Sequence, residues 1–280
     1  MKQAGNPKVK RYFQAVDKLM HTSRTVRDIF DISTLTFGKI VYAEYFDENG
    51  RHREIRYDDF RSRCFVFASQ IAALTHDLPE GSIVGLKLKN CPEWAMVFWG
   101  ILMNGFVPFL LDARASGEAS DHFLEQAGAK ALIADDFHNY ARPRFTLTDL
   151  SSQAPNYSFE PTWENRVIFA SSGTTGEAKL VVFDGENLCA QINAAYEMPN
   201  TTADIMYPPM MGNLKILAFI PFHHIFGFVA VFLWYTFFGK TLVFLHELAP
   251  KEILTTCQKL RVIHVYAVPL FWDNIATTLK

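Results

Sequence analysis

The chain has 280 residues, of which 49% are hydrophobic and 20% charged, and its formal net charge is −2. This composition is typical of a globular protein with a sizeable core and excludes an intrinsically disordered chain. The small net charge gives no general attraction for nucleic acid. Residues 2–27 are locally basic. This usually indicates a solvated helix face, with a weak membrane or partner contact as the alternative.

Cysteines and apolar runs indicate the compartment. Four cysteines are scattered along the chain without a C-x-x-C pair: Cys64, Cys91, Cys189 and Cys257. This pattern favours a reducing, cytoplasmic compartment over a disulfide framework. No apolar segment follows the N-terminal charges, so no secretory signal is predicted. The apolar run Ile225–Phe238 is shorter than the roughly 18–20 residues that span a bilayer, which predicts a buried helix instead.

The chain begins with a helix and a hairpin. Helical spacing of apolar residues predicts an amphipathic helix over residues 1–30. Two strand-like runs, Lys39–Phe46 and Glu54–Tyr57, flank Asn49-Gly50, which is a strong hairpin signal. A helix is expected over Phe60–Leu74, with Asp58 or Asp59 as its N-cap.

From Gly81 onward strands alternate with helices, first over the N-terminal half. Strands are expected at Ile83–Leu88, Phe106–Leu111 and Ala131–Ala134, and helices at Pro92–Asn104 and Gly117–Ala127. Residues 135–164 then lose this periodicity and contain three prolines, which predicts a junction between two lobes. The predicted domains are therefore residues 1–150 and residues 151–280.

The alternation resumes in the second half of the chain. The elements expected there are strands on both sides of residues 171–179, helices at Glu186–Glu197, Ile225–Phe238 and Pro250–Leu260, and strands at Lys215–Ile220, Thr241–Leu245 and Val262–Ala267. Strands interleaved with helices of ten or more residues indicate βαβ crossovers. The predicted fold class is α/β, with two doubly wound lobes and largely parallel sheets.

One stretch between two β-rich runs carries most of the functional signal. Residues 171–179 read SSGTTGEAK, so four hydroxyls, two glycines and a lysine lie in one tight loop. Glycines let successive N–H groups face one anion, which suits a polyphosphate. The Walker loop does not fit, because Lys179 is misplaced and a strand follows instead of a helix. An ordinary Ser/Gly-rich hairpin is the alternative.

This stretch resembles the phosphate-binding signature of the acyl- and aryl-adenylating superfamily, which includes acyl-CoA synthetases, luciferases and peptide-synthetase adenylation domains. That signature is roughly [ST]-S-G-[ST]-T-G-x-P-K-G-V. The chain departs from it at Ala178, where proline is usual, and at Leu180, where glycine is usual. Both departures lie beside Lys179 and make its role less secure than that of the hydroxyls.

A second turn, Ile220–Gly227, combines a proline, aromatic residues and two histidines. By itself it is typical of core packing with satisfied histidines, and no third ligand at a familiar spacing supports a metal site. Beside the phosphate loop it resembles the superfamily's L-P-x-[FY]-H-x-x-G turn. The resemblance puts His224, and not His223, at the acyl-substrate pocket. The candidate pocket residues are Phe222, His224, Phe226, Gly227 and Phe228.

A third match is weaker. Residues 105–112 are similar to the family's G-[AG]-x-x-x-P-[LI]-[DN] segment, and Pro92-Glu93-Trp94 also fits the family at the start of a helix. Their expected role is structural. The three matches occur in the family's order and cover most of residues 35–280.

The resemblance implies a two-step reaction in which a carboxylate, with a fatty acid preferred, attacks ATP to give an acyl-adenylate and pyrophosphate. Coenzyme A (CoA) or a carrier-protein thiol then captures the acyl group. Magnesium would arrive with ATP, because no protein metal cage is visible. His224 and Lys179 are the implied catalytic residues. The implied phosphate-binding residues are Ser171, Ser172, Gly173, Thr174, Thr175, Gly176 and Lys179.

Several later parts of the family pattern are not found before Lys280, namely the adenine-binding turn, the ribose-binding aspartate and the C-terminal domain with its lysine. The chain is therefore expected to be an N-terminal portion that is inactive alone. Two alternatives stay open. One is an adenylation domain that charges a carrier protein with an amino or aryl acid, and the other is a non-catalytic nucleotide-binding or interaction module.

Overall fold

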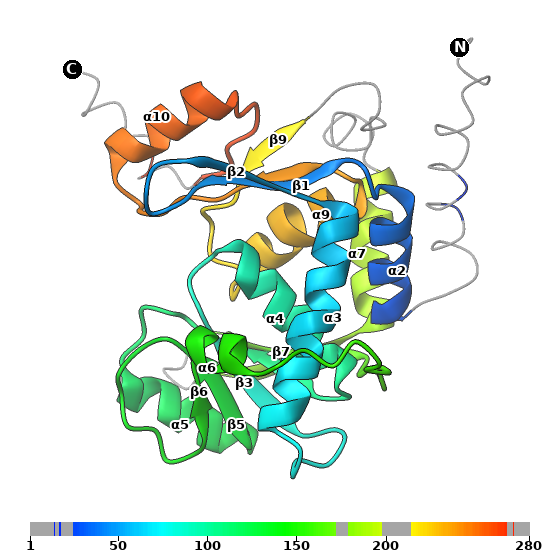
Figure 1. The fold of residues 1–280 in the computed structure, drawn as a ribbon, viewed down its shortest axis with the longest axis vertical. Coiled ribbons are helices and arrows are strands. Elements are labelled where there is room, and N and C mark those ends of the chain that lie inside the picture. The colour runs from blue at the N-terminus through cyan, green and yellow to red at the C-terminus, as the bar shows by residue number, and fades with distance from the viewer. Residues whose placement is uncertain are drawn as a thin grey trace.

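A computed structural model describes residues 25–171, 179–197 and 214–267, together with Gln14, Asp17 and Phe271. Most of the predicted N-terminal helix and the loop 172–178 lie outside the described residues. The described part stacks two β-sheets with helices between them and on their outer faces (Figure 1). The predicted α/β class with mostly parallel sheets is confirmed.

The larger sheet has six strands in the order β6-β5-β3-β4-β7-β8. Its strands are β3 (Ile83–Lys87), β4 (Val107–Leu110), β5 (Ala131–Ala134), β6 (Arg144–Phe145), β7 (Arg166–Ser171) and β8 (Lys179–Asp184). All neighbours run parallel except the hairpin pair β7 and β8. From β3 the chain first passes to β4 on one side and then to β5 on the other, so the direction of winding reverses at β3 and β4.

The smaller sheet has the order β2-β1-β10-β9. Its strands are β1 (Val41–Phe46), β2 (His52–Arg56), β9 (Lys215–Leu217) and β10 (Thr241–Val243). The predicted hairpin is confirmed, since β1 and β2 are antiparallel and Gly50 adopts φ 70° in the connecting turn. β1 pairs in parallel with β10, almost two hundred residues further along the chain.

The predicted division at residue 150 does not separate the two sheets. The hairpin β1–β2 from the first half joins the sheet of β9 and β10, while β7 and β8 from the second half complete the larger sheet. The alternation of strands and helices is a local property of the sequence, whereas the sheet that each strand joins depends on distant partners. The two halves share one continuous hydrophobic core.

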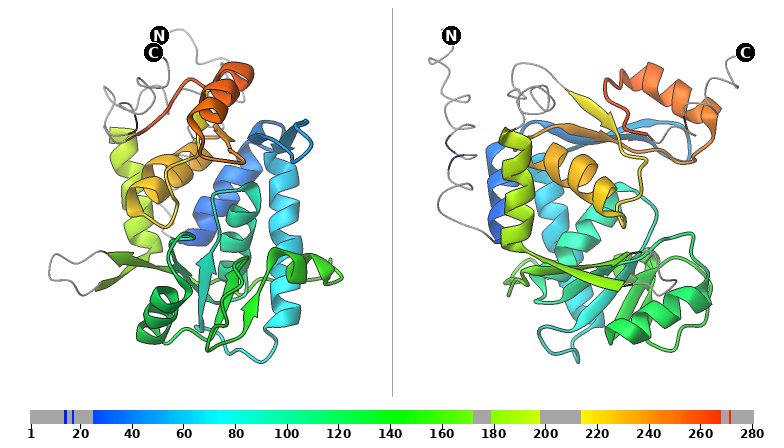
Figure 2. Two further views of the ribbon diagram at one scale, coloured as in Figure 1. Left: turned by 90° about the vertical axis from the view of Figure 1, so that its left-hand side faces the viewer. Right: turned by 180° about the vertical axis from the view of Figure 1, so that it is seen from behind.

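Helices between the sheets carry that core (Figure 2). α3 (Tyr57–Leu74) and α4 (Pro92–Met103) lie there with the helical segment around residues 227–237. Gly100 of α4 lets this helix approach α3 closely, because a Cβ at Gly100 would lie 3.2 Å from the Ala68 nitrogen of α3. α4 is buried on every side, as its uninterrupted apolar sequence demands.

Two further helices cover the outer faces of the sheets. α5 (Gly117–Ala127) lies on the larger sheet and buries Leu124 among its strand residues, and α10 (Pro250–Leu260) lies on the smaller sheet through Ile253 and Leu260. α2 (Val26–Thr36) and α7 (Gly185–Glu197) pack side by side at one side of the molecule, between the levels of the two sheets (Figure 2). The molecule therefore alternates helix and sheet layers.

Several local predictions need correction. Asp58 and Asp59 do not cap α3, which begins earlier, after Arg56, so that both lie in its first turn. Residues 135–164 are not merely a junction, because they contain β6 and α6 (Leu147–Ser152), both too short for a periodic signal. The strand expected at Val262–Ala267 is reduced to a single bridge between His264 and Ile216.

The apolar run Ile225–Phe238 forms a buried helix, as predicted. Its centre, Gly227–Leu233, is a π-helix that continues into α9 (Trp234–Phe237). A π-helical turn inside a helix is uncommon and frequently occurs at functional sites. No helix among the described residues has the length and hydrophobicity needed to cross a membrane.

Candidate functional site

The reversal of winding between β3 and β4 marks the expected ligand crevice. In doubly wound sheets ligands bind beyond the carboxyl ends of the strands where the winding direction changes. Three segments leave the sheet there: residues after β3, residues after β4, and the loop after β7. Leu110 of β4 is in register with Phe169 of β7, so Asp112 and Ser171, each two residues further on, reach the same edge.

The two strands predicted on either side of the Ser/Thr/Gly stretch are confirmed. β7 and β8 are antiparallel over six pairs, the last of which joins Ser171 to Lys179. The hairpin therefore fixes both ends of the loop at the carboxyl edge of the larger sheet. The remaining predicted phosphate-binding residues lie outside the described residues: Ser172, Gly173, Thr174, Thr175 and Gly176.

A side chain after β3 holds the histidine turn against this edge. The Asn90 carboxamide donates from Nδ2 to the carbonyls of Ala218, at 2.9 Å, and Ile220, at 2.8 Å. Its Oδ1 accepts the Phe222 amide at 3.1 Å. One half-buried asparagine thus satisfies three backbone groups of the chain leaving β9. These bonds bring a turn from the smaller sheet to the ligand edge of the larger one.

Asp112, two residues after the end of β4, faces the same turn. Asp112 Oδ2 lies 3.7 Å from His223 Nε2, and its Oδ1 accepts the Arg114 amide at 2.9 Å. Partial burial would raise the pKa of Asp112, but the Arg114 amide and the neighbouring His223 and Arg114 side chains outweigh it and lower the pKa. Burial, assisted by the nearby His224, lowers the pKa of His223 to about 4. His223 is therefore neutral near pH 7.

The turn separates exposed from buried aromatic residues. His224 and Phe226 are exposed, the latter by 56%, and can meet a ligand. Phe222 and Phe228 are fully buried and pack edge-to-face against Trp94, so they are core residues and not pocket walls. Their aromatic spacing fits both roles, and only their contacts with α4 decide between them.

Gly227 has a steric role in this turn. A Cβ at this position would lie 2.3 Å from the Pro221 carbonyl oxygen. That separation is too short for any real contact, so the helix can begin this close to the proline only with glycine. Gly227 was predicted to be a pocket residue, and the structure buries it beneath the turn.

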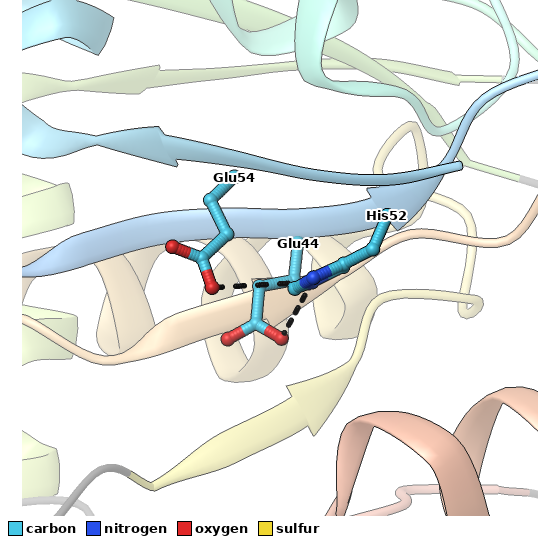
Figure 3. Close-up of side chains that lie close together, drawn as sticks. All are labelled: Glu44, His52 and Glu54. Atoms are coloured by element: carbon cyan, nitrogen blue, oxygen red, sulfur yellow. Dashed lines mark hydrogen bonds and ion pairs between the residues drawn. The ribbon is translucent and has the colours of Figure 1, made fainter.

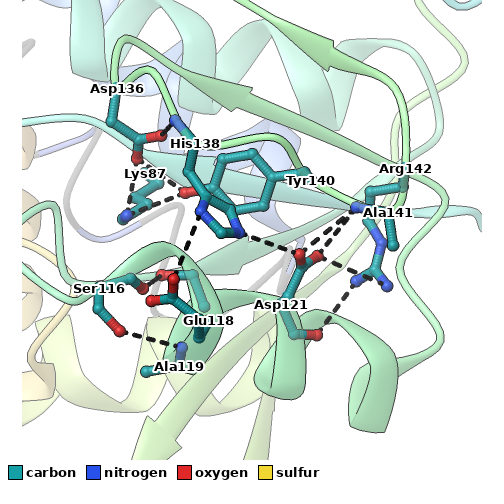
Figure 4. A network of polar contacts seen from close by, with 11 residues as sticks. Lys87, Ser116, Glu118, Ala119, Asp121, Asp136, His138, Tyr140, Ala141 and Arg142 are labelled. Atoms are coloured by element: carbon teal, nitrogen blue, oxygen red, sulfur yellow. Dashed lines mark hydrogen bonds and ion pairs between the residues drawn. The ribbon is translucent and has the colours of Figure 1, made fainter.

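A polar network at the same sheet edge stabilises the ends of β3 and β5 (Figure 4). The buried Lys87 ammonium donates to Asp136 at 2.7 Å and to the Tyr140 hydroxyl at 2.9 Å. Burial alone would raise the pKa of Asp136, but the bonds from Lys87 and Tyr140 lower it. His138 packs on Tyr140 and lies 3.4 Å from Asp121. The charges are paired within this network, which indicates a structural role.

A second cluster, on the smaller sheet, contains potential metal ligands (Figure 3). One ligand atom each from Glu44, His52 and Glu54 lie within 4.8 Å of one another. However, the Lys215 ammonium contacts both oxygens of Glu44, at 2.7 and 2.8 Å. The protein's own cation therefore already balances the buried carboxylate. The cluster lies on β1 and β2 of the smaller sheet and not at the ligand edge of the larger one.

With this geometry in place, sequence comparison identifies the family. The profile of the AMP-binding enzyme family matches residues 38–280. The chain belongs to the AMP-binding enzyme family. The match confirms the resemblance inferred from the Ser/Thr/Gly stretch and the histidine turn.

Three proteins illustrate what the chain is similar to. A probable 4-coumarate–CoA ligase from Dictyostelium discoideum is 22% identical over 233 residues, which cover 69% of this chain and 41% of that protein. O-succinylbenzoate CoA synthetase from Bacillus subtilis superposes with a TM-score of 0.74 at 18% identity, covering 90% of this chain and 64% of that one. The N-terminal subdomain of NpsA from Klebsiella oxytoca, in complex with 3-hydroxyanthranilyl-AMSN, gives 0.65 at 20% identity, with 87% and 60% covered. The chain thus spans less than two thirds of the length of each of these proteins.

Sequence reasoning missed the residues that hold the site together. Asn90, Asp112 and Arg114 were not among the predicted site residues, although the segment ending at Asp112 was noted as structural. A signal was present, because Asn90 and Asp112 each follow a predicted parallel strand within three residues. Their partners come from the turn after β9, which the sequence alone does not place beside them.

Proposed function

We propose that this AMP-binding chain is part of an enzyme that uses ATP to activate a carboxylic acid as an acyl-adenylate, releasing pyrophosphate, and then transfers the acyl group to the thiol of CoA. The observation that carries the proposal is the convergence at one sheet edge. The ends of the Ser/Thr/Gly loop, the Asp112 segment and the histidine turn all meet there. Such an edge suits a nucleotide bound beside an acid.

The predicted phosphate-binding and catalytic residues then each have a role in the first step. Ser171, Ser172, Thr174, Thr175 and the amides of Gly173 and Gly176 would bind the phosphates, and Lys179 would offset their charge. His224 would contact the reacting carboxylate from the exposed side of the turn. Catalysis would consist largely of positioning and charge stabilisation, as in other phosphoryl-group chemistry. Magnesium would bind with ATP, as both do in the Bacillus subtilis protein.

The acid class needs revision in the light of the buried aromatic residues. The preference for fatty acids depends on the aromatic content of residues 219–238 and on the single histidine turn, but Phe222, Phe228 and Phe232 of that segment are wholly buried. The relatives are ligases or complexes of aryl acids, with 4-coumarate, o-succinylbenzoate and 3-hydroxyanthranilate groups in their names. We therefore propose an aryl acid as the first substrate to test and a fatty acid as the second.

The thiol that accepts the acyl group and the cellular compartment are proposed from other observations. CoA is favoured over a carrier protein because two of the relatives are CoA ligases by name. A reducing, cytoplasmic location is proposed because the four cysteines, all among the described residues, form no disulfide, with Cys64 and Cys189 buried as small core residues.

Calorimetry with the 280-residue chain tests the proposal. The probes are AMP, ATP with Mg²⁺, and stable acyl-adenylate analogues that carry an aryl, a fatty or an amino acyl group. We expect binding of the nucleotide and tighter binding of the aryl analogue. The double variant T174A/T175A should weaken nucleotide binding without lowering the melting temperature. As a matched control, S151A/S152A removes two adjacent hydroxyls from α6 and should leave binding unchanged.

The outcomes separate the candidate functions. Tighter binding of an amino acyl analogue would favour a carrier-charging adenylation domain. Nucleotide binding without affinity for any acyl-adenylate would leave a non-catalytic nucleotide-binding module. If the chain binds no nucleotide, or if T174A/T175A binds as well as the unmodified chain, the loop assignment is wrong.

A further inference from the structure

The side chain of His223 is unusual among the residues of the ligand edge. Its Nε2 atom is buried and has no hydrogen-bond partner among the described residues. Only 11% of the side chain is exposed, so solvent does not readily replace that partner. A buried polar atom without a partner costs stability, and a phenylalanine of similar shape would avoid that cost. Where such an atom persists in a folded protein, it calls for an explanation beyond packing.

The neighbours of His223 suggest that explanation. On one side, Nε2 faces Asp112 Oδ2 across 3.7 Å, a little beyond hydrogen-bond length. On the other side, its ring packs on the exposed His224, with the ring centroids 4.1 Å apart and the planes at 46°. His223 therefore lies between an acidic group fixed at the end of β4 and the residue proposed to meet the substrate.

The fixed side of this arrangement is well anchored. The other oxygen of Asp112 accepts a hydrogen bond from the Arg114 amide. Asn90 holds the backbone of the turn by accepting a hydrogen bond from the Phe222 amide. A small movement of the His223 ring toward Asp112 Oδ2 would complete a hydrogen bond, and catalytic hydrogen bonds often shorten only when the ligand is bound. The His223 ring would then be fixed, and His224 would pack against a fixed plane.

We propose that His223 is a positioning residue of the acid-activating site, which orients His224 toward the substrate through a hydrogen bond to Asp112 that closes when ligand binds. This inference rests on the proposed function and assigns a role to the histidine that the family turn does not use. The neutral imidazole can donate from Nε2 while it packs on a second imidazole without charge repulsion.

The variant H223F separates positioning from packing. Phenylalanine keeps a planar ring against His224 but removes Nε2. We expect the melting temperature to rise by a few degrees, because an unpaired buried atom is lost. We also expect the acyl-adenylate analogue to bind about fivefold or more weakly, with AMP affinity unchanged. A purely structural histidine would not give greater stability together with weaker binding of the acyl part.

Two further variants test the route through Asp112. H223Q places a carboxamide N–H near the position of Nε2 and should restore most of the lost affinity. In a D112A background, H223F should cause little additional loss, because the partner is already absent. H122F, which makes the same exchange at an exposed position on α5, should change neither quantity.

The results distinguish this inference from the proposed function. If the unmodified chain binds neither nucleotide nor acyl-adenylate analogue, both are overturned. If it binds them and H223F binds equally well, only the positioning role is overturned. Full additivity of H223F and D112A would likewise refute the action through Asp112.

Discussion

Asn90 offers the sharpest test of how the site is assembled, because it joins the two sheets at the ligand edge. The variant N90A removes three hydrogen bonds to the chain after β9, at 2.8, 2.9 and 3.1 Å. At about 1 kcal/mol for each neutral bond, the free energy of unfolding should fall by about 3 kcal/mol. Because the released backbone belongs to the histidine turn, binding of an acyl-adenylate analogue should weaken by at least about tenfold.

Asn104 provides a matched control at the end of α4. It is also half-buried, and its Nδ2 donates to the carbonyls of Ala68 and Gly100, at 2.9 and 2.7 Å. N104A should lower the free energy of unfolding by about 2 kcal/mol and leave ligand affinity unchanged. Urea denaturation and calorimetry measure the two quantities. If N90A costs less than about 1 kcal/mol, or if both variants weaken binding equally, the reasoning about the turn is refuted.

Three other predictions concern pH, sterics and charge. Burial lowers the pKa of His223 to about 4 from 6.5, so the unfolded chain binds more protons between these values. Stability should therefore fall by up to about 3 kcal/mol as pH drops through that window, and H223F should flatten the curve of melting temperature against pH. G227A should destabilise the protein by at least about 2 kcal/mol in urea denaturation, because the new Cβ would clash with the Pro221 carbonyl oxygen. At an ordinary helical glycine the same substitution would increase stability. K215M leaves the Glu44 carboxylate, 3% exposed, without its cation and should cost about 3–5 kcal/mol in urea denaturation, which the double variant E44Q/K215M should largely recover.

Local elements of the fold were predictable wherever the signal was strong. The helix Gly117–Ala127 and the strand Ala131–Ala134 match the prediction at both ends. The first is bounded by a Ser116 N-cap and by Gly128 in the left-handed conformation, which are both readable from the sequence. Short elements such as α6 escaped prediction because six residues hold too little periodicity.

The motifs of the candidate site could be predicted from the sequence, whereas the residues that hold the histidine turn in place, Asn90 and Asp112, could not. The two strands that frame residues 171–179 agree with the prediction. His224 is exposed, and the role predicted for it stays a prediction. The roles of Phe222 and Phe228 could not be read from the sequence, because an apolar ring fits a pocket wall and a core equally well. Their burial against α4 depends on how a distant helix packs, which no local pattern records.

The alternation of strands and helices can be read from the sequence, and so can the family and the position of the hydroxyl-rich loop between two strands, since each depends on neighbouring residues. Which sheet each strand joins depends instead on tertiary contacts, as for β1 with β10 and β7 with β4. The same holds for the contacts of Asn90 and Asp112 with the histidine turn. These pairings join segments up to two hundred residues apart, and their stability comes from burial and hydrogen bonds that form only when the whole core is assembled.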